Sequence, residues 1–159
     1  MRLPARLAFF WICLAPLLAN AADVSGPARA IDGNSIEIGP LRLRLYGIDA
    51  PETAQSCVKD RMRYRCGQAA ARALAAFIAD RPVACDHLEI LDAGWSTARC
   101  HVGAESVERH MVRAGWALAI RELGLDFLAD EDLARLAGIG LWAGEFLPPW
   151  EWRRLSRLP

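Results

Sequence analysis

The apolar positions between residues 24 and 45 follow the two-residue period of β-strands. Residues 24–31 and 35–38 carry β-branched side chains on either side of an Asp-Gly-Asn turn. Residues 41–45 alternate strictly between leucine and arginine, which predicts a half-buried strand with both arginines on one face. Pro51 ends this pattern, because proline removes a backbone donor and restricts the residue before it.

Helical spacing appears after this strand region. Residues 67–80 are alanine-rich with one apolar face, and Pro82 ends the predicted helix. A hairpin is predicted over residues 83–102, followed by helices over 104–114 and 126–136, the last capped by its first residue, an aspartate. This order of short strands and helices predicts a small closed barrel with helices around it.

The first 21 residues have the pattern of a secretory signal peptide. Two arginines precede the apolar run 7–18, and Ala19-Asn20-Ala21 offers small residues for cleavage after Ala21. Removing residues 1–21 takes away two arginines and no acidic residue, which leaves a net charge of −2. This excludes a strongly basic, DNA-coating protein. We therefore expect residues 22–159 to form one exported or periplasmic domain with a C-terminal tail, a monomer without stable membrane association.

Export changes the interpretation of the cysteines. Cys13 leaves with the signal peptide, and an even number remains: Cys57, Cys66, Cys85 and Cys100. Partners across the predicted hairpin have residue numbers that sum to about 185, which matches Cys85 and Cys100. We therefore predict disulfides Cys85–Cys100 and Cys57–Cys66. Zinc binding is the alternative, but the chain has no Cys-x-x-Cys pair.

Four segments of the chain resemble the thermonuclease, or staphylococcal-nuclease-like, family. They lie in the family's order within residues 24–154, and they are Ala30-Ile31-Asp32-Gly33-Asn34-Ser35, Arg44-Leu45-Tyr46-Gly47-Ile48-Asp49-Ala50-Pro51-Glu52, Val112-Arg113-Ala114-Gly115-Trp116-Ala117 and Gly140-Leu141-Trp142. The resemblance implies an OB-fold, a five-stranded barrel with three α-helices. It also implies calcium-dependent hydrolysis of phosphodiester bonds in DNA and RNA.

The resemblance assigns roles to four residues. Asp49 and the carbonyl of Ala50 would be calcium ligands, Glu52 would activate water, and Arg44 would bind the phosphate. Phosphodiester cleavage needs these groups: a hard cation, a base and a guanidinium. In the alternative interpretation Arg44 and Glu52 form a salt bridge and Asp49 only shapes the turn.

Two residues depart from the family pattern. Asn34 stands where the family has its other acidic calcium ligand, and an amide contributes no charge, so calcium binding should be weak. Counting back from Ala98-Arg99-Cys100 places Trp95 at the position of the family's second catalytic arginine. Such arginines contribute about 10³–10⁵ in rate to phosphoryl transfer. Trp95 can instead stack on a base or sugar, or serve in packing.

The remaining polar and aromatic residues are interpreted structurally. We expect the tail, residues 148–154, to fold onto the barrel, with a nucleic-acid or partner contact as the alternative. The three histidines, at positions 87, 101 and 110, lack ligand spacing. The following acids should lie on solvated helix faces: Glu105, Glu108, Asp130, Glu131 and Asp132.

Three functions are therefore compatible with the sequence. The first is a secreted calcium-dependent nuclease, weak or impaired because of Asn34 and Trp95. The second is a catalytically inactive domain that binds nucleic acid or another anionic ligand through Arg44. The third is an exported module that binds a protein partner.

Overall fold

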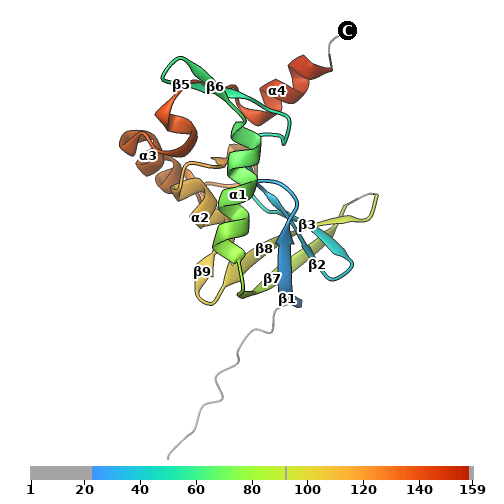
Figure 1. The fold of residues 1–159 in the computed structure, drawn as a ribbon. Helices are drawn as coiled ribbons and strands as arrows, with labels where there is room; N and C mark the ends of the chain where they lie inside the picture. The colour runs from blue at the N-terminus through green and yellow to red at the C-terminus, as the bar shows by residue number, and fades with distance from the viewer. Residues whose placement is uncertain (1–22, 92, 158–159) are drawn as a thin grey trace, which may run out of the picture.

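A closed barrel forms one side of the molecule in the computed structural model, which describes residues 23–91 and 93–157 (Figure 1). Its main sheet has the order β3-β2-β1-β7-β8-β9, and a parallel pairing of β3 with β8 closes five of these strands. The strands are β1 (Val24–Ala30), β2 (Ser35–Ile38), β3 (Leu41–Leu45), β7 (Pro82–Ile90), β8 (Trp95–Val102) and β9 (Glu105–Ser106). The predicted five-stranded OB-type barrel is confirmed.

The alternation of leucine and arginine in β3 produces a half-buried strand, as predicted. Leu43 and Leu45 are buried in the core, whereas Arg42 and Arg44 are exposed on the outer face.

Two small sheets lie beside the barrel. Their strands are β4 (Ile48–Asp49) with β10 (Leu118–Ala119), and β5 (Cys57–Lys59) with β6 (Met62–Tyr64).

Residues 23–91 and 93–157 contain four α-helices, where three were expected for the domain. They are α1 (Cys66–Ile78), α2 (Val107–Arg113), α3 (Leu128–Ala137) and α4 (Pro149–Ser156), with short 3₁₀ turns η1 (Arg121–Leu123) and η2 (Gly140–Ala143). Figure 1 shows α1 between the barrel and the pair α2–α3, with α4 near the C-terminal end. The additional helix α4 lies in the expected tail. Its sequence begins Pro-Trp-Glu-Trp, which places proline at the first helical position, where no backbone donor is needed.

The predicted cap of the third helix is wrong. Phe127, not Asp126, precedes α3, and no side chain caps this helix. Asp126 instead forms an ion pair with Arg99 on β8.

Both predicted disulfides are confirmed. Cys85 lies directly opposite Cys100 in the β7–β8 ladder, and Cys57 is bonded to Cys66 at the start of α1. The first bond is buried in the main core and the second in a smaller cluster around Leu141.

Three acids that were expected on solvated faces are buried. Glu108, Asp130 and Glu131 are only 1%, 5% and 4% exposed. Each has partners that compensate burial. Glu108 accepts hydrogen bonds from the Cys100 amide and the Ser106 hydroxyl, and the other two pair with arginines.

The predicted signal peptide lies outside the described residues. Among residues 23–91 and 93–157, no helix has the length and apolar character needed to span a bilayer.

Candidate active site

One tight turn carries the two carboxylates that the sequence singled out. Asp49 ends β4, where it lies opposite Leu118 of β10, and it is 6% exposed. Glu52 follows in a turn that Gln55 holds through two hydrogen bonds. The backbone N–H of Gln55 donates to the Glu52 backbone carbonyl (2.7 Å), and the side-chain Oε1 of Gln55 accepts from the Glu52 backbone N–H (3.2 Å). A Cβ on Gly67 would lie 1.8 Å from the Glu52 carbonyl oxygen, so only glycine lets α1 pack this closely against the turn.

A second turn brings Asn34 to the same place. A Cβ on Gly33 would lie 2.7 Å from the methyl groups of both Ala50 and Ala70, so this turn also depends on glycine. Asn34 is buried, and its Nδ2 lies 3.4 Å from Asp49 Oδ1. The structure therefore places Asn34, Asp49 and Ala50 together, as the resemblance implies for the calcium ligands.

Arg153, which the sequence analysis did not assign to the site, binds both carboxylates. It projects from α4; its Nη1 lies 2.7 Å from Glu52 Oε1 and 3.2 Å from Asp49 Oδ1, and its Nη2 lies 2.7 Å from Asp49 Oδ2. The hydrogen bonds to Asp49, and then those to Glu52, raise the pKa of the Arg153 guanidinium above its ordinary value, although partial burial opposes them. Arg153 is thus a permanent positive charge held between two carboxylates.

Arg44 lies on β3 opposite Ser35, the residue after Asn34. Its guanidinium is 5.7 Å from the centre of the Trp95 ring, and the Arg42 guanidinium is 6.0 Å from it, because β3 and β8 run side by side. Within the described part of the chain, Arg44 makes no ion pair with Asp49 or Glu52. The alternative Arg44–Glu52 salt bridge is therefore wrong, since the partner of Glu52 is Arg153.

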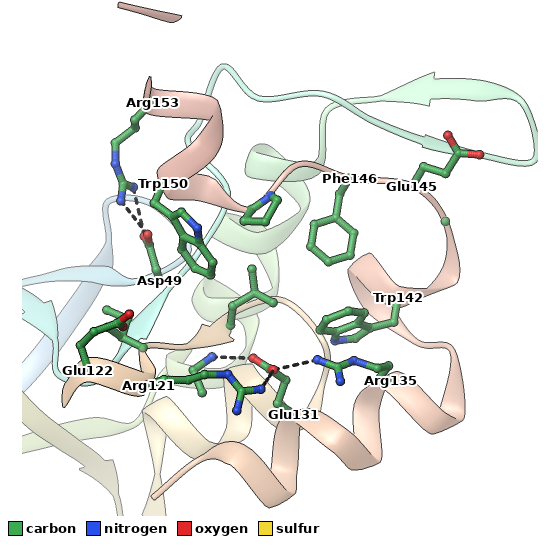
Figure 2. Close-up of a pocket in the computed structure, with 15 residues that line it drawn as sticks. Asp49, Arg121, Glu122, Glu131, Arg135, Trp142, Glu145, Phe146, Trp150 and Arg153 are labelled. Atoms are coloured by element: carbon green, nitrogen blue, oxygen red, sulfur yellow. Dashed lines mark hydrogen bonds and ion pairs between the residues drawn. The ribbon is translucent and has the colours of Figure 1, made fainter. Parts of the chain in front are cut away.

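A pocket of about 890 Å³ opens beside the turn (Figure 2). Asp49 and Arg153 lie at one end, and Glu131 lies at the other with Arg121 and Arg135. The wall between them is aromatic, and it is formed by Trp142, Phe146 and Trp150. The site thus combines a charged end with flat apolar surface, which suits a ligand that has both anionic and ring-shaped parts.

The chemistry of these residues fits a hard cation. Among the described residues, no three His, Cys, Asp or Glu side chains form a metal-binding group. A cation at Asp49 would therefore also need neutral oxygen donors, and the Asn34 amide and the Ala50 carbonyl are of that type. The Arg153 guanidinium already acts as a stand-in cation for this oxygen-rich turn.

No local pattern could have identified Arg153. It is separated from Asp49 by 104 residues, and the tail signalled only aromatic and basic character. The acidic turn itself was the available signal, because a buried carboxylate needs a positively charged partner, but the sequence alone does not show which arginine supplies it.

Comparison with known proteins gives consistent matches. The family model described as staphylococcal nuclease homologue matches residues 42–144, which is more than half of the chain. The chain is 34% identical over 133 residues to the "Succinoglycan biosynthesis protein ExoI" of Rhizobium meliloti (strain 1021), covering 80% of this chain and 69% of that protein. It is 32% identical over 146 residues to "Protein ParB" of Escherichia coli, covering 80% and 77% of the two chains.

Proposed function

Because the chain belongs to the staphylococcal nuclease homologue family, we propose that it is an exported, calcium-dependent nuclease with a weak active site. The observation that carries this proposal is the Asp49–Glu52 turn, which presents two carboxylates around a single positive charge at the edge of a pocket. Export is supported by the two disulfides, which form and persist in oxidising compartments.

The calcium site would be formed by Asp49, the amide oxygen of Asn34 and the carbonyl of Ala50. In the present orientation the Asn34 nitrogen faces Asp49, and rotation of the amide would present its oxygen instead. A bound calcium ion would polarise the phosphoryl oxygens of the substrate. We expect low affinity, because Asn34 contributes no negative charge.

The other steps belong to side chains of this protein. Glu52 would accept a proton from the attacking water, since its carboxylate lies at the turn and is partly exposed. Arg44 would donate hydrogen bonds to the phosphate from the neighbouring strand. Trp95 supplies one N–H, whereas an arginine at that position would offer five donors in a planar fork. We therefore expect at least 10²-fold slower cleavage than in a family member with the complete site, roughly the effect of losing one such donor group.

The test is cleavage of single-stranded DNA by the mature protein, with calcium or with a chelator. Glu52→Gln should abolish the calcium-dependent rate, because the amide cannot accept the proton. Glu145→Gln is the matched control, since Glu145 lines the same pocket but lies away from Asp49 (Figure 2). Equal rates for wild type and Glu52→Gln, or a rate unaffected by the chelator, would contradict the proposal.

A second candidate function is nucleic-acid binding without cleavage. It is favoured by the exposed cluster in which Arg42 and Arg44 flank Trp95, which combines positive charge with an aromatic ring. Binding of single-stranded DNA that is lost in Arg44→Ala, without cleavage at any calcium concentration, would favour this function.

A further inference from the structure

We propose that Arg153 sets the cation affinity of this site: its guanidinium and a divalent cation bind Asp49 in alternation, so that cation binding breaks the Arg153 contacts with Asp49 and Glu52 and releases α4. The inference rests on the proposed function in that it concerns the same carboxylates. It requires cation binding there but does not require cleavage.

The geometry makes the two occupants mutually exclusive. Arg153 lies within 3.2 Å of both oxygens of Asp49 and one oxygen of Glu52. A calcium ion approaches its oxygen ligands to 2.3–2.6 Å, so it would compete with the guanidinium for the same Asp49 oxygens. Two positive charges at this separation also repel each other strongly in a partly buried site. The guanidinium must therefore leave for a cation to enter.

Helix α4 is attached in a way that permits this movement. The segment before it is fixed, because Glu145 pairs with Val58 through two backbone hydrogen bonds and the Leu147 carbonyl accepts from Gln55 Nε2 at 2.7 Å. Beyond that point, Arg153 makes all the hydrogen bonds and ion pairs recorded between α4 and other described elements.

The remaining contacts of α4 with the domain are limited. Pro149 is buried and Trp152 is partly buried, whereas Trp150 and Leu155 are 42% and 43% exposed. An isolated helix of eight residues is also marginal in water, so α4 depends on its attachment. Loss of the Arg153 contacts should therefore free the helix from Pro148 onward.

Release of α4 would change the pocket as well as the cation site. Trp150 and Arg153 line the pocket from α4, next to Asp49 (Figure 2). Their departure would open the pocket on the side of the carboxylates, where a substrate phosphate would have to enter. The cation-free protein would thus hold its own site closed.

The direct test is calcium titration by calorimetry of Arg153→Ala, with Arg154→Ala as the matched control. Arg154 is the next residue on the same helix, and it pairs only with Glu151 of that helix. If the Arg153 pair is closed in about nine molecules of ten, its removal should tighten apparent calcium binding about tenfold. Arg154→Ala should bind calcium as the wild type does. Arg153→Lys, which keeps the charge but loses the bidentate contact, should be intermediate.

Amide hydrogen exchange over residues 149–156 provides the second readout. Saturating calcium should accelerate exchange in the wild type, whereas Arg153→Ala should exchange fast with or without calcium. Unchanged or weaker calcium affinity in Arg153→Ala, or unchanged exchange of α4 in wild type with calcium, would overturn the inference. These readouts are independent of cleavage: an affinity shift without any nuclease activity would contradict the proposed function alone.

Discussion

Two pairs of carboxylates each place one member, Asp49 or Glu131, on the wall of the same pocket, and the two pairs are compensated very differently. Asp130 and Glu131 of α3 have four arginines as ion-pair partners: Arg109, Arg113, Arg121 and Arg135. Glu131 also accepts the backbone amide of Ala119 at 2.8 Å. In the part of the chain that the structure describes, Asp49 and Glu52 share one arginine, Arg153, which comes from the C-terminal helix. Two carboxylates therefore pair with four guanidinium groups on α3, whereas the two carboxylates of the turn pair with one.

This difference separates a structural cluster from a functional one. The pair on α3 links α2, η1 and β10 to α3, and its removal would leave buried polar groups without partners. The pair in the turn keeps an excess of negative charge beside the pocket opening. The proposed function therefore assigns the cation to the turn, where the negative charge is only partly compensated, and not to the pair on α3.

The largest expected effect comes from completing the undercompensated site. The double substitution Asn34→Asp with Trp95→Arg should raise the rate of DNA cleavage at saturating calcium by at least about 10²-fold, because it restores one charged ligand and one guanidinium. Initial rates on single-stranded DNA measure this gain, and Glu52→Ala in the same background should remove most of it. If the double variant is no faster than wild type, the remaining site has lost its catalytic geometry and the binding function is the better account.

The next effect concerns the α3 cluster, which consists of Asp130, Glu131 and their arginine partners. Glu131→Ala should reduce the free energy of unfolding by about 2–3 kcal/mol, because the buried Ala119 amide loses its acceptor and Arg135 and Arg121 lose a partner. Urea denaturation measures the change. Calcium affinity should stay at the wild-type value, and a large loss of it in this variant would show that the two clusters are not separate.

The sequence predicted features that depend on local spacing. The leucine–arginine alternation identified β3, and hairpin numbering paired Cys85 with Cys100, because strand period and turn position determine both. Helical spacing wrongly predicted that Glu108 and Glu131 lie on solvated helix faces, whereas both are buried. A helical pattern that is polar on one face does not reveal which distant groups will cover that face.

The site was predictable only in part for the same reason. Asn34, Asp49 and Glu52 could be named because they lie in short continuous segments that resemble the staphylococcal-nuclease-like family. The position of Arg153 follows from how α4 packs after the whole barrel has closed. Such long-range contacts leave no periodic trace in the sequence.

Glu108 offers a third case, a buried acid whose main partners are neutral. Burial raises the pKa of its carboxyl above the ordinary 4.5, although hydrogen bonds from the Cys100 amide and the Ser106 hydroxyl oppose this. Because the folded pKa is the higher one, stability is lost as the pH rises from about 4.5 through the folded value. Glu108→Gln mimics the protonated form, so its stability relative to wild type should increase between pH 4 and pH 7. Thermal unfolding at both values tests this, and a parallel pH dependence of the two proteins would contradict it.

The smallest expected effect is on the stability of Arg153→Ala without metal. The Arg153 side chain is 36% exposed and the site borders an open pocket, so water can replace the guanidinium; the loss should not exceed about 1.4 kcal/mol, which is what a pair closed in about nine molecules of ten contributes. In saturating calcium the difference should disappear, since tenfold tighter binding to the folded state adds about 1.4 kcal/mol to the variant and offsets the loss. Chemical denaturation with chelator and then with calcium measures both differences, with Arg154→Ala as the control. A variant that stays less stable than wild type by the same amount in both conditions would make Arg153 a structural residue like those of the α3 cluster, because its ion pair would then not compete with the cation.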